Sequence, residues 1–425
     1  MQQHASLTLP RRSILTRLRF ALAGALLLVP FIPLAVRVYL LPETAMANTI
    51  TVSMWANITA VFLEAWTRLS IRTYPGTRSS ATILPSVSAA HATVLAALLL
   101  LRLPYDRLAV TMGYAIHVGW SFLLYFVNQR RLRQRIAVLP FGEVDLLTGI
   151  DSIDWHVMRS PSLAEADGCD AMVADFAALP DEWEALLADA AVEGRLVYQV
   201  KQLHESLTGR VQVDKLSENS FGSLIPTRSY SVAKGIGDWI FAVALLPVVL
   251  PLMALVAIAI RLDSPGPAIF RQQRVGQGGK PIRIYKFRTM SVVEEASAER
   301  GIAMTAADDP RITRVGHFLR KSRIDELPQI LNILRGEMSW IGPRPEAAVL
   351  SAWYAGDVPF YRYRHVVKPG ISGWAQVKQG HVAEVDEIYE KLQYDFFYIK
   401  YFSPWLDVLI LFKTLRTVVS GFGAK

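Results

Sequence analysis

Two acidic residues, Asp325 and Glu326, stand side by side between basic residues and a proline in the stretch KSRIDELPQILNIL. The pattern predicts a helix start, with Asp325 as the N-cap and Pro328 in the first turn, where a missing N–H costs little. A helix N-terminus also attracts anions, and an ionised aspartate can attack phosphorus to form an acyl phosphate. Glu326 could hold Mg²⁺, which takes carboxylate and phosphate oxygens together. The pair is therefore either an ordinary helix start or a site of phosphoryl transfer.

Positive charge surrounds this pair. Arg320, Lys321 and Arg323 precede it, so an ionised aspartate could meet a phosphate without prohibitive repulsion. Arg344 lies between two prolines in GEMSWIGPRPE, which hold its guanidinium in a defined direction suited to bidentate phosphate binding. Further bases crowd into RQQRVGQGGKPIRIYKFRTM, where alternation predicts a strand with bases on one face and GQGG predicts a tight turn. Such bases could bind a phosphate substrate or anionic lipid headgroups.

The composition indicates a membrane protein. The chain has 425 residues, which favours more than one domain, and 52% of them are hydrophobic with a net charge of +8. A basic excess on an apolar chain suits an anionic membrane surface or an anionic substrate. The single cysteine, Cys169, excludes a disulfide framework or a cysteine metal site within one chain and suits a reducing compartment.

The first third, residues 1–134, predicts four transmembrane helices, each about long enough to cross a bilayer. The first apolar run is long and lacks a cleavage pattern, so we interpret it as a retained segment. Arginines before the first run, after the second and after the fourth place both ends of this unit in the cytoplasm. The four predicted spans are Phe20–Leu41, Ala47–Trp66, Ala81–Leu103 and Leu108–Val127.

Three polar residues, Glu64, His91 and His117, lie within or near these spans. Polar residues inside a membrane can mark function. We interpret these three instead as interhelix hydrogen-bonding groups or as residues at the membrane interface.

Residues 135–230 have a soluble composition. RIAVLPF, DWHVM, AMVADF and RLVYQV predict short strands, and DEWEALLADAAVEG predicts a helix with an acidic start and a glycine stop. The alternation of strands and helices indicates a small Rossmann-like α/β domain with a partly parallel sheet. The phosphate fingerprint GxGxxG is missing, so we interpret this domain as a structural or regulatory module.

The next apolar segment, about residues 236–262, carries no charge between Trp239 and Ile260. Hydropathy alone favours a fifth spanning helix, with a mild kink at Pro247 and Pro251. A re-entrant helix that enters, breaks and returns would instead keep the rest of the chain cytoplasmic. Near the C-terminus, DFFYIKYFSPWLDVLILFKTLRTVVSGFG predicts either an interfacial helix on the membrane or a packed core helix.

From about Ser231 to Gly423 the chain resembles the bacterial sugar transferase family, the monotopic phosphoglycosyl transferases. The motifs that carry the resemblance are LDSPGPAIFRQQRVG, YKFRTM, DDPRITRVGHFLRKSRIDELPQILNILRGEMSWIGPRPE, PGISGWAQV and KLQYDFFYIKYFSPWLDVLILFKTL. They cover a little under half the chain. The four leading spans and the α/β module are similar to the large multi-span subclass.

The resemblance implies an α+β catalytic domain over residues 231–425 with a re-entrant membrane helix. It makes Asp325 the nucleophile and Glu326 its magnesium-associated partner, and it gives Arg320 and Arg344 to substrate phosphate or nucleotide. Lys286 and Arg288 lie in a shared motif and are further candidates for substrate binding. The re-entrant helix of the family often breaks at Ser-Pro, whereas this chain has Leu250–Pro251.

The resulting expectation is a multi-pass enzyme of the bacterial inner membrane with a cytoplasmic active site. It would transfer a sugar 1-phosphate from a UDP-sugar to undecaprenyl phosphate and release UMP, as the first membrane step of exopolysaccharide, capsule or O-antigen synthesis. Mg²⁺ is the expected cofactor; membrane lipid and a second copy of the chain are expected partners, and nucleic acid is not. Two alternatives stay open, a non-catalytic scaffold of a polysaccharide assembly complex and a glycosyl transferase that releases UDP. The sequence does not name the sugar.

Overall fold

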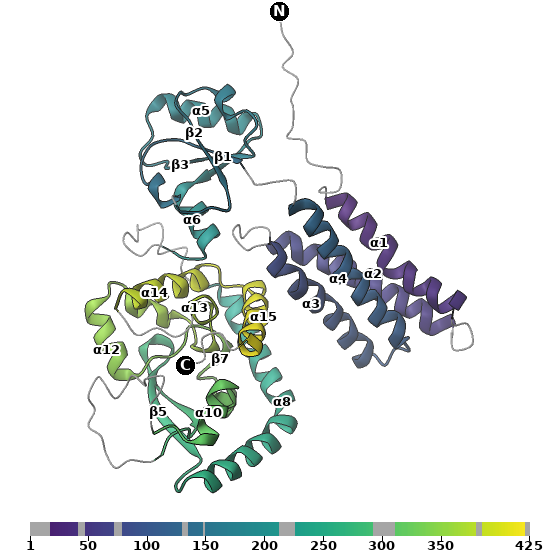
Figure 1. Cartoon of the computed structure of the whole chain (residues 1–425), viewed down its shortest axis with the longest axis vertical. Coiled ribbons are helices and arrows are strands. Elements are labelled where there is room, and N and C mark those ends of the chain that lie inside the picture. The colour runs from purple at the N-terminus through teal and green to yellow at the C-terminus, as the bar shows by residue number, and fades with distance from the viewer. Residues whose placement is uncertain are drawn as a thin grey trace, which may run out of the picture. The chain divides into compact units, whose positions relative to one another are not determined.

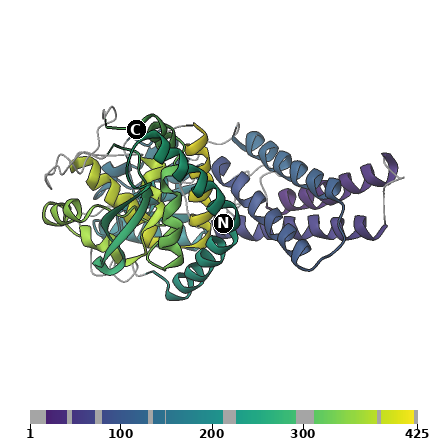
Figure 2. The same ribbon diagram turned by 90° about the horizontal axis from the view of Figure 1, so that it is seen from below.

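A computed structural model describes residues 18–40, 47–71, 79–129, 135–147, 149–211, 226–291, 311–379 and 385–420. The chain divides into two compact units, Met1–Gly209 and Arg210–Lys425. Figures 1 and 2 show their helices and strands from two directions.

The N-terminal helices pack side by side as a bundle (Figures 1 and 2). They are α1 (Leu18–Ala35), continued by the π-helical η2 (Val36–Leu40), α2 (Ala47–Ile71), α3 (Ser79–Leu100) and α4 (Arg107–Gln129). Of the helices that the structure describes, four are long and apolar enough to cross a membrane, namely α1, α3, α4 and the later helix α8. The second predicted span is helical but is not among these four, because α2 is less apolar and carries buried polar residues such as Asn57 and Glu64.

The polar residues of the bundle meet one another between helices. His91 Nε2 of α3 lies 3.2 Å from His117 Nδ1 of α4, and His117 Nε2 lies 3.8 Å from the Glu64 carboxylate of α2. All three side chains are buried. The predicted interhelix role of these residues is therefore confirmed.

The α/β module contains four parallel strands in the order β2-β1-β3-β4. One face of the sheet packs against α5 (Asp181–Val192) and the other against α6 (Val200–Thr208). All four predicted strands are confirmed, and the described sheet is wholly rather than partly parallel. The strands are β1 (Arg135–Val138), β2 (Asp154–Val157), β3 (Ala171–Ala174) and β4 (Leu196–Gln199), and two short 3₁₀ turns, η4 (Val144–Leu147) and η5 (Leu163–Ala166), connect them.

The second unit combines short strands with helices. An antiparallel hairpin, β5 (Ile269–Val275) and β6 (Pro281–Phe287), turns at η6 (Gln277–Gly279), where Gly278 and Gly279 have positive φ, as GQGG predicts. A parallel pair joins β7 (Ser339–Ile341) to β8 (Gly370–Ser372). The helices are α10 (Arg314–Lys321), η7 (Ile324–Gln329), α11 (Ile330–Leu334), α12 (Ala348–Asp357), η8 (Tyr361–Val366), α13 (Trp374–Lys378), α14 (Val385–Lys400) and α15 (Pro404–Ser420).

The C-terminal aromatic segment forms two helices, α14 and α15, rather than one. Phe396 and Tyr398 of α14 and Ile410 of α15 are almost fully buried in the largest core of this unit. The structure therefore favours the packed-core interpretation of this segment over the interfacial helix.

Helix α8 (Arg228–Asp263) is helical throughout its 36 residues, including Pro247 and Pro251, so the predicted break does not appear as an interruption of the helix. Figure 1 shows that α8 bends along its course. A straight helix of this length would extend about 54 Å. In its first turns Tyr230 and Lys234 contact α15, nearer its middle Ala242 packs against residues of α11 and β6, and near its end Ile260 packs against α10 and the end of β6. Both ends of α8 therefore lie on the same domain.

Polar contacts fix the first turns of α8. Asp407 of α15 accepts hydrogen bonds from Tyr230 and Lys234, each at 2.6 Å. One turn further along α8, Asp238 accepts a 2.6 Å hydrogen bond from Ser339 of β7. These contacts join α8 to α15 and to the strand that leads to the Arg344 loop.

The β7–β8 pair requires glycine at a close approach of two backbones. A Cβ at Gly370 would lie 2.1 Å from the backbone nitrogen of Gly342. We therefore expect Gly370→Ala to destabilise this unit by about 1–3 kcal/mol, because backbone atoms would have to move. Thermal unfolding of the purified protein in detergent measures the effect. Gly356→Ala in α12 is the control, since open space surrounds it. Equal unfolding temperatures for both variants would contradict the prediction.

Candidate active site

A 3₁₀ turn, η7, presents the acidic pair. Arg323 adopts a left-handed conformation with φ 57°, so the chain reverses after α10 and the turn starts at Ile324. Asp325 and Glu326 lie inside this turn, and Arg323 occupies the N-cap position. The predicted N-cap role of Asp325 is therefore wrong, because the left-handed residue moves the start of the turn upstream.

Glu326 is buried and paired with two cations. One of its oxygens, Oε1, accepts hydrogen bonds from Lys286 Nζ at 2.9 Å and from Arg344 Nη2 at 2.8 Å. Burial alone would raise the pKa of Glu326, but Arg344 and Lys286 more than offset this and hold the pKa well below its usual range. Strand β6, turn η7 and the loop after β7 thus meet at one ionised carboxylate.

Asp325 titrates close to neutral pH. Burial and the neighbouring charge of Glu326 raise the pKa of Asp325 to about 6, and the positive charges of Lys286, Arg344 and Arg320 act in the opposite direction. A carboxylate with such a shifted pKa beside a cluster of cations is a candidate nucleophile or base.

The other predicted site residues divide into two groups. Arg320 lies close enough to Asp325 to influence its pKa, and its Nε donates to Thr289 Oγ1 at 2.9 Å. Arg288 does not join the ion cluster at Glu326. Its guanidinium donates instead to Ser264 and Pro265, at distances of 2.6 to 2.9 Å, and so binds the carbonyl end of α8. A cation at a helix C-terminus is favourable, and the substrate-binding role of Arg288 stays a prediction.

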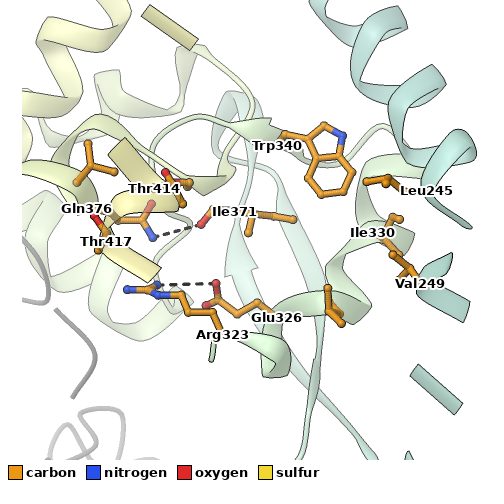
Figure 3. A pocket seen from close by; sticks show the side chains of 13 residues that line it. Leu245, Val249, Arg323, Glu326, Ile330, Trp340, Ile371, Gln376, Thr414 and Thr417 are labelled. Atoms are coloured by element: carbon orange, nitrogen blue, oxygen red, sulfur yellow. Dashed lines mark hydrogen bonds and ion pairs between the residues drawn. The ribbon is translucent and has the colours of Figure 1, made fainter. Parts of the chain in front are cut away.

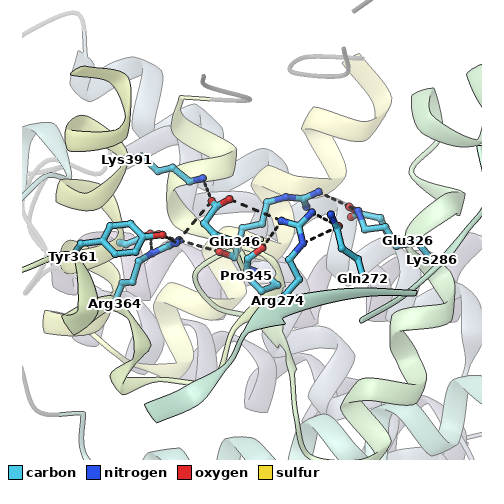
Figure 4. Close-up of polar contacts among 11 residues, drawn as sticks. Gln272, Arg274, Lys286, Glu326, Pro345, Glu346, Tyr361, Arg364 and Lys391 are labelled. Carbon is cyan, nitrogen blue, oxygen red and sulfur yellow. Dashed lines mark hydrogen bonds and ion pairs between the residues drawn. The ribbon is translucent and has the colours of Figure 1, made fainter. Parts of the chain in front are cut away.

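A second buried carboxylate, Glu346, supports the Arg344 loop (Figure 4). Lys391 donates to its Oε1, and the guanidinium groups of Arg364 and Arg274 lie 3.8 and 3.9 Å from its carboxylate oxygens. These charges hold the pKa of Glu346 well below its usual range although burial acts to raise it. Glu346 is therefore an anion that gathers three bases around the loop.

Two of these bases hold the loop backbone directly. Arg364 Nη2 donates to the Arg344 carbonyl at 2.9 Å, and Arg274 Nη1 donates to the Pro345 carbonyl at 2.9 Å. Arg364 is in turn paired with Asp395 of α14 at 2.7 Å. The sequence showed Arg274 only as one base of a crowded segment, and no local pattern pointed to Arg364 or Asp395.

A mainly apolar pocket lies beside Glu326 (Figure 3). It is bounded by α8 and η7 on one side and by β8, α13 and α15 on the other. Of the described residues that line it, only Arg323 and Glu326 are charged. The lining comprises Leu245, Val249, Arg323, Glu326, Leu327, Ile330, Trp340, Ile371, Ser372, Gln376, Val377, Thr414 and Thr417.

The Glu326 carboxylate is already paired with cations in this arrangement. Glu326 Oε1 already accepts from two cations, and Arg323 Nη1 lies 4.0 Å from Oε2. Within the part of the chain that the structure describes, no three His, Cys, Asp or Glu side chains gather as a metal site. Magnesium binding through Glu326 stays a prediction.

The fold and the site define a class of protein. The chain combines helices able to span a membrane with a domain in which a titratable aspartate lies among arginines and a lysine, as phosphate chemistry requires. Comparison with known proteins agrees. The family model described as Bacterial sugar transferase matches residues 229–421.

Two relatives match more of the chain than the family model does. The chain is 44% identical over 354 residues to UDP-N-acetylgalactosamine-undecaprenyl-phosphate N-acetylgalactosaminephosphotransferase of Aeromonas hydrophila, which is 83% of each chain. UDP-glucose:undecaprenyl-phosphate glucose-1-phosphate transferase of Xanthomonas campestris pv. campestris is 44% identical over 333 residues, 76% of this chain and 60% of that one. The Escherichia coli (strain K12) transferase of the same name is 41% identical over 190 residues, 44% of this chain and 40% of that one.

This chain therefore belongs to the bacterial sugar transferase family and is an enzyme of the phosphoglycosyl transferase class.

The Arg364–Asp395 pair allows a test of the second ion cluster. The two side chains are 2% and 1% exposed, so Asp395→Ala would leave a buried arginine without its closest partner. We expect a loss of stability of about 3–5 kcal/mol, measured by thermal unfolding in detergent. Glu193→Ala is the control, because it removes a partner of the more exposed Arg195 and should cost less than about 1 kcal/mol. Similar losses in both variants would contradict the buried role.

Proposed function

We propose that this enzyme transfers a sugar 1-phosphate from a UDP-sugar to undecaprenyl phosphate, giving undecaprenyl diphosphate-sugar and UMP. The observation that carries the proposal is the cluster of the buried Glu326 with the half-buried Asp325, Lys286 and Arg344, in which the pKa of Asp325 is raised to about 6. This reaction would be the first membrane step in the assembly of an exopolysaccharide, a capsule or an O-antigen.

In the first step the ionised Asp325 carboxylate attacks the β-phosphorus of the UDP-sugar. A bond forms between a carboxylate oxygen and phosphorus, and the bond from that phosphorus to the bridging oxygen breaks. UMP leaves with the electron pair. Positive charge from Arg344, Lys286 and Arg320 surrounds the position of attack and offsets the negative charge of the phosphates.

In the second step an oxygen of the lipid phosphate attacks the phosphorus of the aspartyl phospho-sugar. The bond to Asp325 breaks and the carboxylate is restored. Glu326 does not need to react in either step. Its role here is to hold Lys286 and Arg344 in place, because both donate to the same carboxylate oxygen. Two displacements on one aspartate predict ping-pong kinetics.

Helix α8 is the element that would place the proposed site at the membrane. We propose that it is re-entrant, because both of its ends pack on the same domain and its outer residues, such as Phe241, Val248 and Leu255, are exposed and apolar. Its bend takes the place of the Ser-Pro break, with Pro247 and Pro251 weakening the helix locally. This arrangement keeps the site at the cytoplasmic interface of the inner membrane. Most arginines that predict this orientation lie outside the described residues.

The relatives suggest which donors to test. The Aeromonas relative, which is similar over 83% of each chain, is named for UDP-N-acetylgalactosamine, and the Xanthomonas relative is named for UDP-glucose. We propose a UDP-hexose or UDP-N-acetylhexosamine donor, with UDP-N-acetylgalactosamine as the first to test.

Nucleotide release tests the reaction class. Purified protein with undecaprenyl phosphate, magnesium and a panel of UDP-sugars should release UMP from one donor, and Asp325→Asn should reduce this release by at least about 1,000-fold because it removes the nucleophile. Asp357→Asn, on the exposed end of α12, is the control. Release of UDP would indicate ordinary glycosyl transfer. Release of neither nucleotide with any donor would favour a scaffold.

The pH dependence of the first step, on its acid side, should follow the ionisation of Asp325. Only the ionised carboxylate attacks, so the rate of UMP release should rise with pH up to about pH 6, the pKa of Asp325, and level off above it. Glu326→Gln should move this rise to lower pH, because it removes the negative charge that helps to raise the pKa of Asp325. Rapid-quench measurements of UMP without lipid acceptor provide the profile. A rise that stays at the same pH in Glu326→Gln would contradict the assignment to Asp325.

A further inference from the structure

The pocket beside Glu326 is chemically divided. Leu245 and Val249 of α8 form an apolar wall with Ile330 and Ile371, and hydroxyl groups of Thr414 and Thr417 lie on the α15 side. The two charged lining residues, Arg323 and Glu326, face one another in Figure 3. A ligand that fits this lining has a long apolar part and an anionic end.

Arg323 is suited to meet that anionic end. Its guanidinium lies 4.0 Å from Glu326 Oε2, whereas Arg344 and Lys286 hold Glu326 at 2.8 and 2.9 Å. Glu326 therefore stays paired if Arg323 turns toward another anion. The side chain of Arg323 is 31% exposed, so it is partly accessible to a ligand.

The pocket also borders the proposed membrane face. Leu245 and Val249 are one helical turn apart and line the pocket, while the neighbouring Val248 and Leu250 are exposed on the outside of α8. A chain lying in the bilayer could therefore pass along α8 into the pocket without crossing polar surface.

We infer that Arg323 binds the phosphate of the acceptor lipid and that the pocket holds the isoprene units next to that phosphate. The inference rests on the proposed function and adds the residues that select the acceptor. A polyprenyl phosphate has the required form, one anionic group on a branched apolar chain. Bound in this way, its phosphate lies beside Glu326 and its sequence neighbour Asp325, the position from which it attacks the aspartyl phospho-sugar. An apolar pocket next to the intermediate also excludes water, which would otherwise hydrolyse it.

The test separates the two half-reactions. The enzyme is placed in phosphatidylcholine nanodiscs, where UMP release without acceptor measures the first step and transfer to added undecaprenyl phosphate measures the second. Leu245→Trp fills the pocket and Arg323→Gln removes its positive charge. For each variant we compare two factors, the increase in the KM for undecaprenyl phosphate and the decrease in the rate of UMP release without acceptor. We expect the first factor to be at least about ten times the second.

Two matched variants serve as controls. Val248→Trp places the same side chain on the exposed face of α8, and Arg314→Gln removes an exposed arginine of α10 outside the pocket lining. Both should leave the KM for the acceptor within about twofold of the wild type. Arg323 is partly exposed, so Arg323→Gln keeps the test decisive if Leu245→Trp does not fold.

The outcomes distinguish this inference from the proposed function. Normal UMP release with an unchanged acceptor KM in both pocket variants would overturn the inference and leave the function intact. Absence of UMP release from the wild type would overturn the function itself. A third arm compares discs with and without phosphatidylglycerol. A KM defect that vanishes without phosphatidylglycerol would assign the pocket to an ordinary anionic phospholipid and overturn the inference, whereas a defect of the same size in both supports it.

Discussion

A carboxylate in a protein interior takes up a proton unless positive charge is held against it, and Glu326 stays ionised because Lys286 and Arg344 both donate to one of its oxygens. These three residues come from strand β6, turn η7 and the loop after β7. Each element is short, so none could hold its charged residue in place alone. The hairpin β5–β6, the pair β7–β8 and the packing of η7 against α8 together keep the cluster assembled.

The same cluster sets the chemistry of its neighbour. Glu326 and burial raise the pKa of Asp325, while the surrounding cations keep that pKa low enough for ionisation at neutral pH. One carboxylate is thus ionised and holds two cations, and the other has a raised pKa. Arg364 and Arg274, which surround Glu346, donate to the backbone carbonyls of Arg344 and Pro345. The backbone of the Arg344 loop is therefore held in place as well as the Arg344 side chain.

Helix α8 connects this polar interior to an exposed apolar surface. Its first turns are tied to Asp407 and Ser339, its middle residues line the apolar pocket, and the two residues that follow it, Ser264 and Pro265, accept hydrogen bonds from Arg288. The proposed reaction brings a soluble nucleotide sugar and a membrane lipid together at one aspartate. It therefore needs a polar and an apolar surface side by side, and α8 provides the apolar surface.

Several features follow from the sequence alone. Length and apolar composition indicated the membrane helices, and short strand-like runs indicated the strands of the α/β module. Alternation in PIRIYKF indicated β6, and GQGG indicated the turn before it, because all these patterns are local. Residue types around Asp325 indicated phosphate chemistry. The pairing of Glu326 with Lys286 and Arg344 was not readable, since these residues are 40 and 18 positions away and only packing brings them together. The same holds for Arg364 and Asp395, for Arg288 at the end of α8, and for the left-handed Arg323 that displaced Asp325 from the N-cap. Local periodicity determines which elements form, whereas the partner of a buried charge is decided by which elements pack against it.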